Sequence, residues 1–399
     1  MTTVAEIVAN DLCIGCGLCE AVTESRVQMA MTPSGSLRPT PLDAFSACEE
    51  QKVIDCCPGV VAEARAADDM PMDPIWGRHG AMRYAWAANA EVRFEAATAG
   101  VLTSLGQYLL RSETAAFVLH TGADPAQPMR SRWVVSETPE EVQANKGSRY
   151  GPTAPLAGIE SALERNEPFA VIAKPCDLGA LHRLSSLDPR IDRLVAARLA
   201  MVCGGQSRLS KSRRLLEEFG IEESAVSLFR YRGHGNPGPT RVETIEGEAF
   251  EIGYLQMWED EGTWDVETRC KLCPDALGEA ADVVVADVWP GGAPTGEDEG
   301  FSGVIARSAI GESLVTDAAS EGCIVLGEPI SPRSFDDMQP HQVRKKAALA
   351  ARYEGLGDAG VSPIATRGLR IEELGRRLSP SEARSQRAGA AARIGRARA

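Results

Sequence analysis

The sequence has few aromatic residues, no long hydrophobic run and no recognisable export signal. Phe, Trp and Tyr make up only 5% of its 399 residues, which gives no evident stacking platform for a large planar macrocycle. No stretch approaches the roughly 18 apolar residues that a membrane-spanning helix needs. The start, MTTVAEIVAN, lacks the basic region and the long apolar core of a secretory signal. We therefore expect a cytoplasmic protein with no segment inserted in a membrane.

Positive charge is scarce as well. The formal net charge is −14, and such an acidic chain is a poor ligand for nucleic acid, because the phosphate backbone needs a basic surface. The exception is the end of the sequence, where five arginines and no acid follow Glu382. This stretch is rich in Ala, Gly and Arg. It therefore predicts a mobile basic tail over residues 381–399, with or without a function of its own.

Cysteine, in contrast, is frequent. The chain has eleven cysteines, which in the absence of an export signal favours metal binding or redox chemistry over disulfides. Six of them lie in residues 1–75, where long periodic segments are few. We therefore predict a small cofactor-binding module over residues 1–75. The prolines and glycines of MPMDPIWGRHG, which follows, predict a linker.

Residues 80–333 alternate between helical and strand patterns, which predicts an α/β core. Apolar residues recur at helical spacing over 98–113, and Gly220 ends a second predicted helix, SRLSKSRRLLEEFG. The apolar runs AAFVLH, FAVIA, ARLAMV, VVVAD and SGVIA predict strands. RVETIEGEAFEIGY alternates around a Glu-Gly turn and predicts a hairpin inserted in the core. A helical C-terminal segment is expected over 334–380, and the fold class is mixed α+β and α/β.

The segment DLCIGCGLCE, residues 11–20, places Cys13, Cys16 and Cys19 at two equal spacings. C-x2-C-x2-C is the spacing with which bacterial ferredoxins hold three corners of a [4Fe–4S] cluster. Three thiolates this close converge only if the backbone curls tightly, and the intervening glycines permit that curl. The segment therefore predicts a ferredoxin-like iron–sulfur module.

The fourth ligand of this module is not in the same run. Thr23 and Glu24 occupy the places where a ferredoxin has its fourth cysteine and the following proline. Cys57 precedes a proline in CCPG and is therefore favoured, with Cys56 and Cys48 as rivals. Four thiolates also suit a structural zinc ion, although zinc sites usually pair CxxC knuckles.

Four further cysteines occur in the predicted core, in AKPCD, MVCGG and RCKLCPD: Cys176, Cys203, Cys270 and Cys273. The first two follow apolar strands, and strand ends at one edge of an α/β sheet face a common crevice. The CxxC pair can add two thiolates and complete a four-cysteine shell. The alternative is that Cys176 and Cys203 are ordinary buried residues, as Cys323 is expected to be.

The order of these motifs resembles the coenzyme F420 hydrogenase/dehydrogenase beta-subunit family, from about residue 10 to residue 330. The resemblance rests on CIGCGLC, CPG, ATAGVLTSL, YLL, KGSRYGP, AKPCD, MVCGG, FRYRGHGNPG, RCKLCPD, ADVVVADVW and FSGVIAR. Members are flavoproteins that pass electrons between iron–sulfur clusters and a substrate or deazaflavin. The resemblance implies FAD in the α/β core and two [4Fe–4S] clusters, one on Cys13, Cys16, Cys19 and Cys57 and one on Cys176, Cys203, Cys270 and Cys273.

The same resemblance points to residues that bind FAD. They are Thr98, Ala99, Gly100 and Thr103 in the small-residue turn, Lys146, Ser148 and Tyr150 in KGSRYGP, Arg230, Arg232 and Gly233 in RYRGHGNPG, and Asp287 at a strand end. Small residues let backbone amides approach a phosphate, and arginines bind anions. Ala99 departs from the family's Ser-Gly-Gly. By itself KGSRYGP is equally consistent with a polar surface loop, and Asp287 with a helix cap.

His234 is the candidate proton donor, because histidine titrates near neutral pH; a solvated loop histidine is the alternative. The predicted function is reduction of an unsaturated or activated small molecule by electrons that pass from reduced ferredoxin through the clusters to FAD. One alternative is an F420-oxidising or F420-reducing beta subunit of a larger complex. Another is a non-catalytic electron-transfer subunit or zinc-stabilised scaffold. A homo-oligomer is compatible with the sequence.

Overall fold

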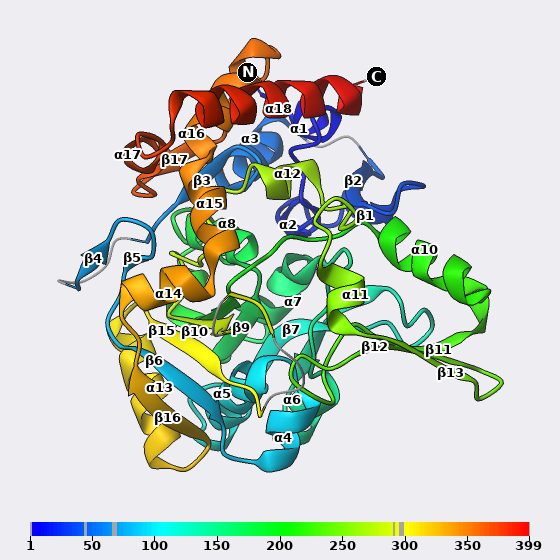
Figure 1. The fold of residues 1–399 in the computed structure, drawn as a ribbon, viewed down its shortest axis with the longest axis vertical. Helices are drawn as coiled ribbons and strands as arrows, with labels where there is room; N and C mark the ends of the chain where they lie inside the picture. Colours follow the sequence, from blue (N-terminus) through cyan, green and yellow to red (C-terminus); the bar gives the residue numbers. More distant parts are fainter. Residues whose placement is uncertain (1, 44–45, 66–69, 290–291, 295–298, 399) are drawn as a thin grey trace.

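The computed structural model describes residues 2–43, 46–65, 70–289, 292–294 and 299–398 (Figure 1). Its centre is an eight-stranded sheet in the order β16-β6-β15-β14-β10-β9-β7-β8. The strands are β6 (Met82–Ala87), β7 (Phe117–Ala123), β8 (Ser131–Ser136), β9 (Phe169–Ala173), β10 (Val195–Met201), β14 (Val283–Asp287), β15 (Ser302–Ala306) and β16 (Ile324–Pro329). The predicted α/β core is confirmed.

The four central strands, β14, β10, β9 and β7, run parallel, and the outer pairings are antiparallel. Parallel strands are covered on both faces and therefore read as continuous apolar runs. In β14, for example, residues 283–286 are all at most 3% exposed. The carboxyl ends of these four strands lie at one edge of the sheet, where a ligand crevice is expected.

Helices cover this sheet and extend beyond it. The α-helices up to residue 320 are α4 (Ala90–Glu95), α5 (Val101–Arg111), α6 (Pro139–Ala144), α7 (Ile159–Glu164), α8 (Pro175–Ser185), α9 (Arg190–Leu194), α10 (Leu209–Phe219), α11 (Tyr254–Trp258), α12 (Thr268–Lys271) and α13 (Ala309–Ser320), and the 3-10 helices are η1 (Thr98–Gly100), η2 (Pro155–Gly158) and η3 (Glu223–Ala225). The left-handed Gly220 ends α10 as predicted. Among the described helices, none combines the length and apolar character that crossing a membrane requires.

The predicted hairpin is present and has a third strand. β12 (Thr240–Thr244) and β13 (Ala249–Ile252) pair antiparallel, and β11 (Val226–Arg230) joins them on the other side. This small sheet packs on α10 and α11 through a separate apolar cluster that includes Phe229, Tyr231 and Trp258. It lies beside the main sheet (Figure 1).

The N-terminal residues form short elements: α1 (Val4–Ala9), α2 (Leu18–Val22), the hairpin β1 (Val27–Met31) and β2 (Leu37–Pro41), α3 (Ala47–Cys56) and β3 (Val61–Glu63). β3 pairs in parallel with β17 (Ala365–Arg367), close to the other end of the chain.

Cys323 packs against the core as expected.

The expected linker MPMDPIWGRHG is instead part of the packed structure. It forms the short antiparallel pair β4 (Met72–Asp73) and β5 (Gly77–Arg78). Trp76 between them is fully buried and lies 4.7 Å from the ring of Phe335. A large aromatic side chain gains too much from burial to stay in a solvated linker, and truncating one costs about 3–5 kcal/mol.

The C-terminal segment is helical, as expected: α14 (Pro332–Met338), α15 (Pro340–Ala347), α16 (Leu349–Asp358), α17 (Ile371–Gly375) and α18 (Pro380–Arg398). Residues 381–399 were expected to form a mobile tail, but up to residue 398 they continue the helix α18. Ala390 and Ile394 are buried in a cluster with α16 and with Ile7 of α1. The apolar side chains are sparse but share one face, which suffices to dock the helix against α16 and α1.

Candidate functional site

The loop that carries Cys13, Cys16 and Cys19 curls as the glycines suggested. Gly15 and Gly17 have φ of 72° and 89°, in the left-handed region that side chains with a Cβ avoid. A Cβ at Gly15 would lie 2.6 Å from the carbonyl oxygen of Leu37, and one at Gly17 would lie 2.5 Å from the amide of Ala157. Both glycines are therefore required by the conformation and by close packing.

Cys57 joins these three cysteines. Burial raises the pKa of Cys19, and repulsion from Cys57, Cys16 and Cys13 raises it further, so the four sulfurs lie within electrostatic range of one another. Amides face two of the sulfurs, since the N–H groups of Gly15 and Gly59 donate to Cys13 and Cys57 over 3.4 Å each. We call Cys13, Cys16, Cys19 and Cys57 the first cysteine group.

The rivals of Cys57 lie elsewhere. Cys48 is exposed. Cys56 is buried, and burial raises its pKa to about 12, but the charges that act on it are those of Arg183 and Asp55. Cys56 packs in the same buried apolar cluster as Cys16, but the charges of the loop cysteines are not among those that act on its pKa. The choice of Cys57 as fourth ligand therefore agrees with the geometry and stays a prediction.

The other four cysteines also gather, and we call Cys176, Cys203, Cys270 and Cys273 the second cysteine group. Burial raises the pKa of Cys270 to about 12, with added repulsion from Cys203 and Cys273. The pKa of Cys176 is raised by burial and by Asp177, and Cys273 contributes again. The amide of Gln206 donates to Cys270 over 3.3 Å. Cys176 follows β9 and Cys203 follows β10, so the expected strand-end placement is present.

Both groups suit an iron–sulfur cube in the chemistry of their donors. In the part of the chain that the structure describes, no three His, Cys, Asp or Glu side chains converge closely enough to hold one metal ion. A cube places each thiolate on its own iron and does not need such convergence. Burial raises the pKa of seven of these thiols, and ligation to a cluster would release their protons: Cys13, Cys16, Cys19, Cys57, Cys176, Cys203 and Cys270. Amides that donate to sulfur stabilise the thiolate form.

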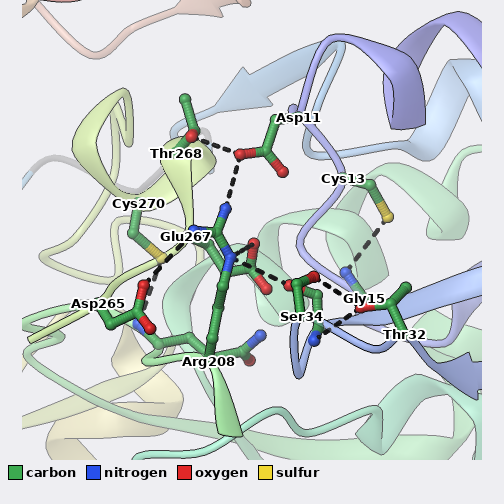
Figure 2. Close-up of polar contacts among 12 residues, drawn as sticks. Asp11, Cys13, Gly15, Thr32, Ser34, Arg208, Asp265, Glu267, Thr268 and Cys270 are labelled. Carbon is green, nitrogen blue, oxygen red and sulfur yellow. Dashed lines mark hydrogen bonds and ion pairs between the residues drawn. The ribbon is translucent and has the colours of Figure 1, made fainter. Parts of the chain in front are cut away.

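A buried charge network connects the segments that carry the two groups. Arg38 on β2 forms ion pairs with Asp11 at 2.8 Å and with Glu267 at 2.7 Å. Arg208 also contacts Asp11, at 2.8 Å, and the hydroxyl of Thr268 donates to the same carboxylate (Figure 2). Asp11 precedes the first cysteine loop, and Glu267 and Thr268 precede Cys270. The network therefore fixes the two groups relative to each other.

A cavity of about 610 Å³ opens at the carboxyl edge of the sheet, which is within the usual range of cofactor and ligand sites. Seven predicted flavin residues line it, together with Cys203 of the second group: Thr98, Thr103, Lys146, Ser148, Tyr150, Arg232 and Asp287. Ala99 and Gly100 are buried and do not line it; the amide of Ala99 donates to Asn236 over 3.2 Å. Arg230, Gly233 and His234 do not line it either.

Arg232 is the most constrained polar group of the cavity wall. It is 1% exposed, and its Nη1 donates to Asp287 at 2.6 Å and to the Tyr150 hydroxyl at 3.4 Å. Burial disfavours its charge, but Asp287 and the neighbouring tyrosines outweigh burial and raise its pKa. Its Nη2 is buried and has no hydrogen-bond partner. A buried donor of this kind suits an anionic group such as a phosphate.

His234 lies away from the cavity, near Phe94. Burial lowers its pKa, with Arg230 as the next contribution, so it is neutral at pH 7. The role of His234 as proton donor therefore has no geometric support.

Lys146 forms an ion pair with Glu95 at 2.9 Å while it also lines the cavity.

Two features of the cavity were missed by the sequence reasoning. Lys174, inside the motif AKPCD, lines the cavity and forms a 2.8 Å ion pair with Asp177. The second feature is an aromatic wall made of Tyr150, Tyr254, Trp258, Trp264 and His341. These residues are scattered in the sequence, so overall aromatic content did not reveal the wall. Lys174 was detectable, since a lysine at a strand end beside cysteines faces the same crevice.

Family models match two consecutive stretches of the chain. The coenzyme F420 hydrogenase/dehydrogenase beta-subunit N-terminal model matches residues 82–159, and the C-terminal model of the same beta subunit matches residues 166–331. Together they match more than half of the chain. The chain belongs to the coenzyme F420 hydrogenase/dehydrogenase beta-subunit family. The matched stretches contain the second cysteine group and the seven predicted flavin residues that line the cavity. The first cysteine group lies outside them.

One individual relative and one solved structure are also similar to this chain. An uncharacterized protein of Methanocaldococcus jannaschii is 22% identical over 265 residues, which cover 65% of this chain and 92% of the relative. A chain of the F420-reducing [NiFe] hydrogenase complex from Methanosarcina barkeri superposes with a TM-score of 0.51 at 19% identity, covering 70% of this chain and 96% of that one. This likeness supports the fold.

Proposed function

We propose that this member of the family is an iron–sulfur flavoprotein reductase of the cytoplasm. It takes single electrons from reduced ferredoxin, through two [4Fe–4S] clusters, to FAD, and reduces an unsaturated or activated small molecule. The observation that carries the proposal is the pair of four-cysteine groups, of which the second borders the cavity through Cys203. Residues 1–75 would be the cluster module and 80–333 the catalytic core.

The chain's own residues divide the work at the cavity. Arg232, held by Asp287, and Lys146 would bind the anionic part of FAD. Lys174 places a positive charge between the cavity and the second cysteine group, where it favours added electrons. Burial raises the pKa of the Tyr254 hydroxyl, which therefore stays protonated and can donate a hydrogen bond into the cavity. Bound FAD supplies the ability to collect two electrons and deliver them together.

A second candidate is oxidation or reduction of coenzyme F420 by this chain as a beta subunit of a larger redox complex. The family is named for that coenzyme, and the M. barkeri complex with a similar fold is described as F420-reducing. In this candidate electrons enter or leave at the flavin, and the first cysteine group is not the inlet.

The test uses the full chain, purified without oxygen. The proposal expects about eight iron and eight sulfide per chain, by the four-thiolate rule for each cube, and bound FAD. Rapid-mixing absorbance then follows flavin reduction by reduced ferredoxin and by reduced F420, in the unmodified protein and in Cys16→Ala. Cys48→Ala, which changes an exposed cysteine, is the matched control.

The outcomes separate the candidates. Loss of reduction by ferredoxin in Cys16→Ala, with dithionite still effective, supports the ferredoxin reading. An unchanged ferredoxin rate in Cys16→Ala, or fast exchange with F420 alone, moves the F420 reading ahead. Zinc in place of iron, or absence of flavin, would end both redox readings and leave a zinc-stabilised scaffold.

A further inference from the structure

Arg269 is a buried cation that lies between the two cysteine groups, and the proposed function gives it no role. It is 2% exposed. Its Nε donates to the carbonyl oxygen of Pro58 over 2.8 Å. Within the described residues, no carboxylate forms an ion pair with it, and its main electrostatic partners are Cys273, Cys176 and Tyr353. A buried guanidinium without a countercharge is costly, so its surroundings must supply the negative charge.

The sulfurs around Arg269 come from both groups. Cys273 and Cys176 of the second group lie within electrostatic range of its guanidinium. Cys57 of the first group lies within range as well. The hydrogen bond to Pro58 holds the guanidinium beside Cys57, and Arg269 itself precedes Cys270. One cation therefore faces sulfurs of both groups.

Gln206 shows independently that the two groups are adjacent. Its backbone amide donates to the sulfur of Cys270 over 3.3 Å. Its side-chain amide donates to the carbonyl oxygen of Ile14 over 3.0 Å, and Ile14 lies between Cys13 and Cys16. A single residue therefore touches the cysteine loop of one group and a sulfur of the other.

We propose that Arg269 is a counter-ion shared by the two clusters, which favours the reduced form of both. This inference rests on the proposed function, because it requires a cluster on each cysteine group. Each cluster gains one electron on reduction, and no bond forms or breaks. A fixed positive charge stabilises the more negative, reduced state, so removing it should lower both reduction potentials.

The cations near one group alone provide the contrast. Lys345 is 7% exposed, donates to the carbonyl oxygen of Gly204 over 3.4 Å, and acts on Cys203 and Cys270. Among the described residues, the sulfurs that it acts on belong to the second group. Neutralising Lys345 should therefore move one potential, whereas neutralising Arg269 should move two.

The experiment is a dithionite titration of the full chain with bound clusters, followed by low-temperature electron paramagnetic resonance. Unmodified protein, Arg269→Gln, Arg269→Lys and Lys345→Met are compared, with iron content and circular dichroism as checks. For Arg269→Gln we expect the ratio of reduced to oxidised cluster at a fixed potential to fall about tenfold at both sites, about 59 mV for a one-electron couple. Arg269→Lys keeps the charge and should shift both by less. Lys345→Met should shift the second alone.

A shift at one cluster only, or at neither, in the Arg269 variants would overturn the shared role. If Arg269→Gln fails to take up iron, the decision passes to Arg269→Lys, in which both potentials must still fall together. Failure of the proposed function looks different: unmodified protein would then contain one cluster or none before any variant is compared.

Discussion

Three sulfurs of the first cysteine group lie in one loop and the helix turn after it, whereas the sulfurs of the second come from three segments far apart in the chain. Cys13, Cys16 and Cys19 are close because of local backbone geometry, with glycines at the positions that need left-handed φ. Cys176 and Cys203 are close only because β9 and β10 are parallel neighbours. A local site depends little on the sheet, but a site made of strand ends depends on the whole core.

The two groups also differ in what they border. The first is covered by the apolar cluster of the terminal helices, which Cys13 and Cys57 contact. The second borders the cavity through Cys203, with Lys174 between. Damage to the first group should therefore remove a cluster and little else, while damage to the second should spread to the flavin site and to the fold.

The largest expected effect is that of Cys273→Ala. About half the iron should be lost, most of the flavin with it, and the thermal midpoint should fall, because formation of this site is coupled to folding of the core. Iron, FAD and the unfolding midpoint are measured on protein purified without oxygen. Normal flavin content in Cys273→Ala would show that the second group and the cavity are independent. The two cysteine groups would then not differ in their effect on the flavin site.

Cys16→Ala is the matched variant in the first group. It should also lose about half the iron, by the four-thiolate rule, yet keep its FAD and nearly all of its thermal stability. Iron and flavin analysis beside Cys273→Ala gives the comparison directly. Full retention of iron would remove Cys16 from the ligands, and parallel loss of FAD would mean that the first group supports the cavity as well.

Serine variants at three neighbouring cysteines sharpen the description of the first group. Cys57→Ser should lower iron content and weaken the resonance of the reduced cluster, whereas Cys48→Ser and Cys56→Ser should leave both near the unmodified level. The reason is that Cys57 is electrostatically coupled to Cys13 and Cys19 of the cysteine loop, whereas the charges that act on Cys56 are those of Arg183 and Asp55. Loss at Cys48 or Cys56 and none at Cys57 would overturn the assignment.

Sequence reasoning succeeded where the information is local. The spacing of Cys13, Cys16 and Cys19 and the apolar runs of β9, β10 and β14 are visible over a few residues. It failed where long-range packing decides: Trp76 is buried by Phe335, which lies far along the chain, and α18 docks through a few small apolar side chains. The motif at 230–234 was found, but which of its side chains lines the cavity depends on the backbone, and only Arg232 does.

The smallest expected effect is on the pH dependence of the free energy of unfolding, through a histidine in the cavity wall. His120 lines the cavity, and burial lowers its pKa from 6.5 to about 4. Between pH 6.5 and about 4, the imidazole is therefore protonated in the unfolded chain and neutral in the folded chain. The free energy of unfolding falls as the pH drops through this range, by on the order of 3 kcal/mol at most.

His120→Gln should remove that dependence, because glutamine does not titrate and can still bond to Ser136, which lies 2.8 Å from the imidazole Nε2. Denaturant unfolding of the two proteins at several pH values provides the measurement. Equal loss of stability in acid for both would mean that other groups dominate. His79→Gln, at a histidine outside the cavity wall, serves as control.

The position of α16 and α18 has a consequence for biosynthesis. Tyr353 on α16 donates to the carbonyl oxygen of Leu272 over 3.1 Å, directly beside Cys273, and Arg352 donates to that of Lys271 over 2.6 Å. Ile394 closes the apolar cover over Cys13 and Cys57. Both helices follow all eight of these cysteines in the sequence. During synthesis both sets of thiols would therefore stay uncovered until residues 349–398 had been made, which would leave them accessible to cluster insertion.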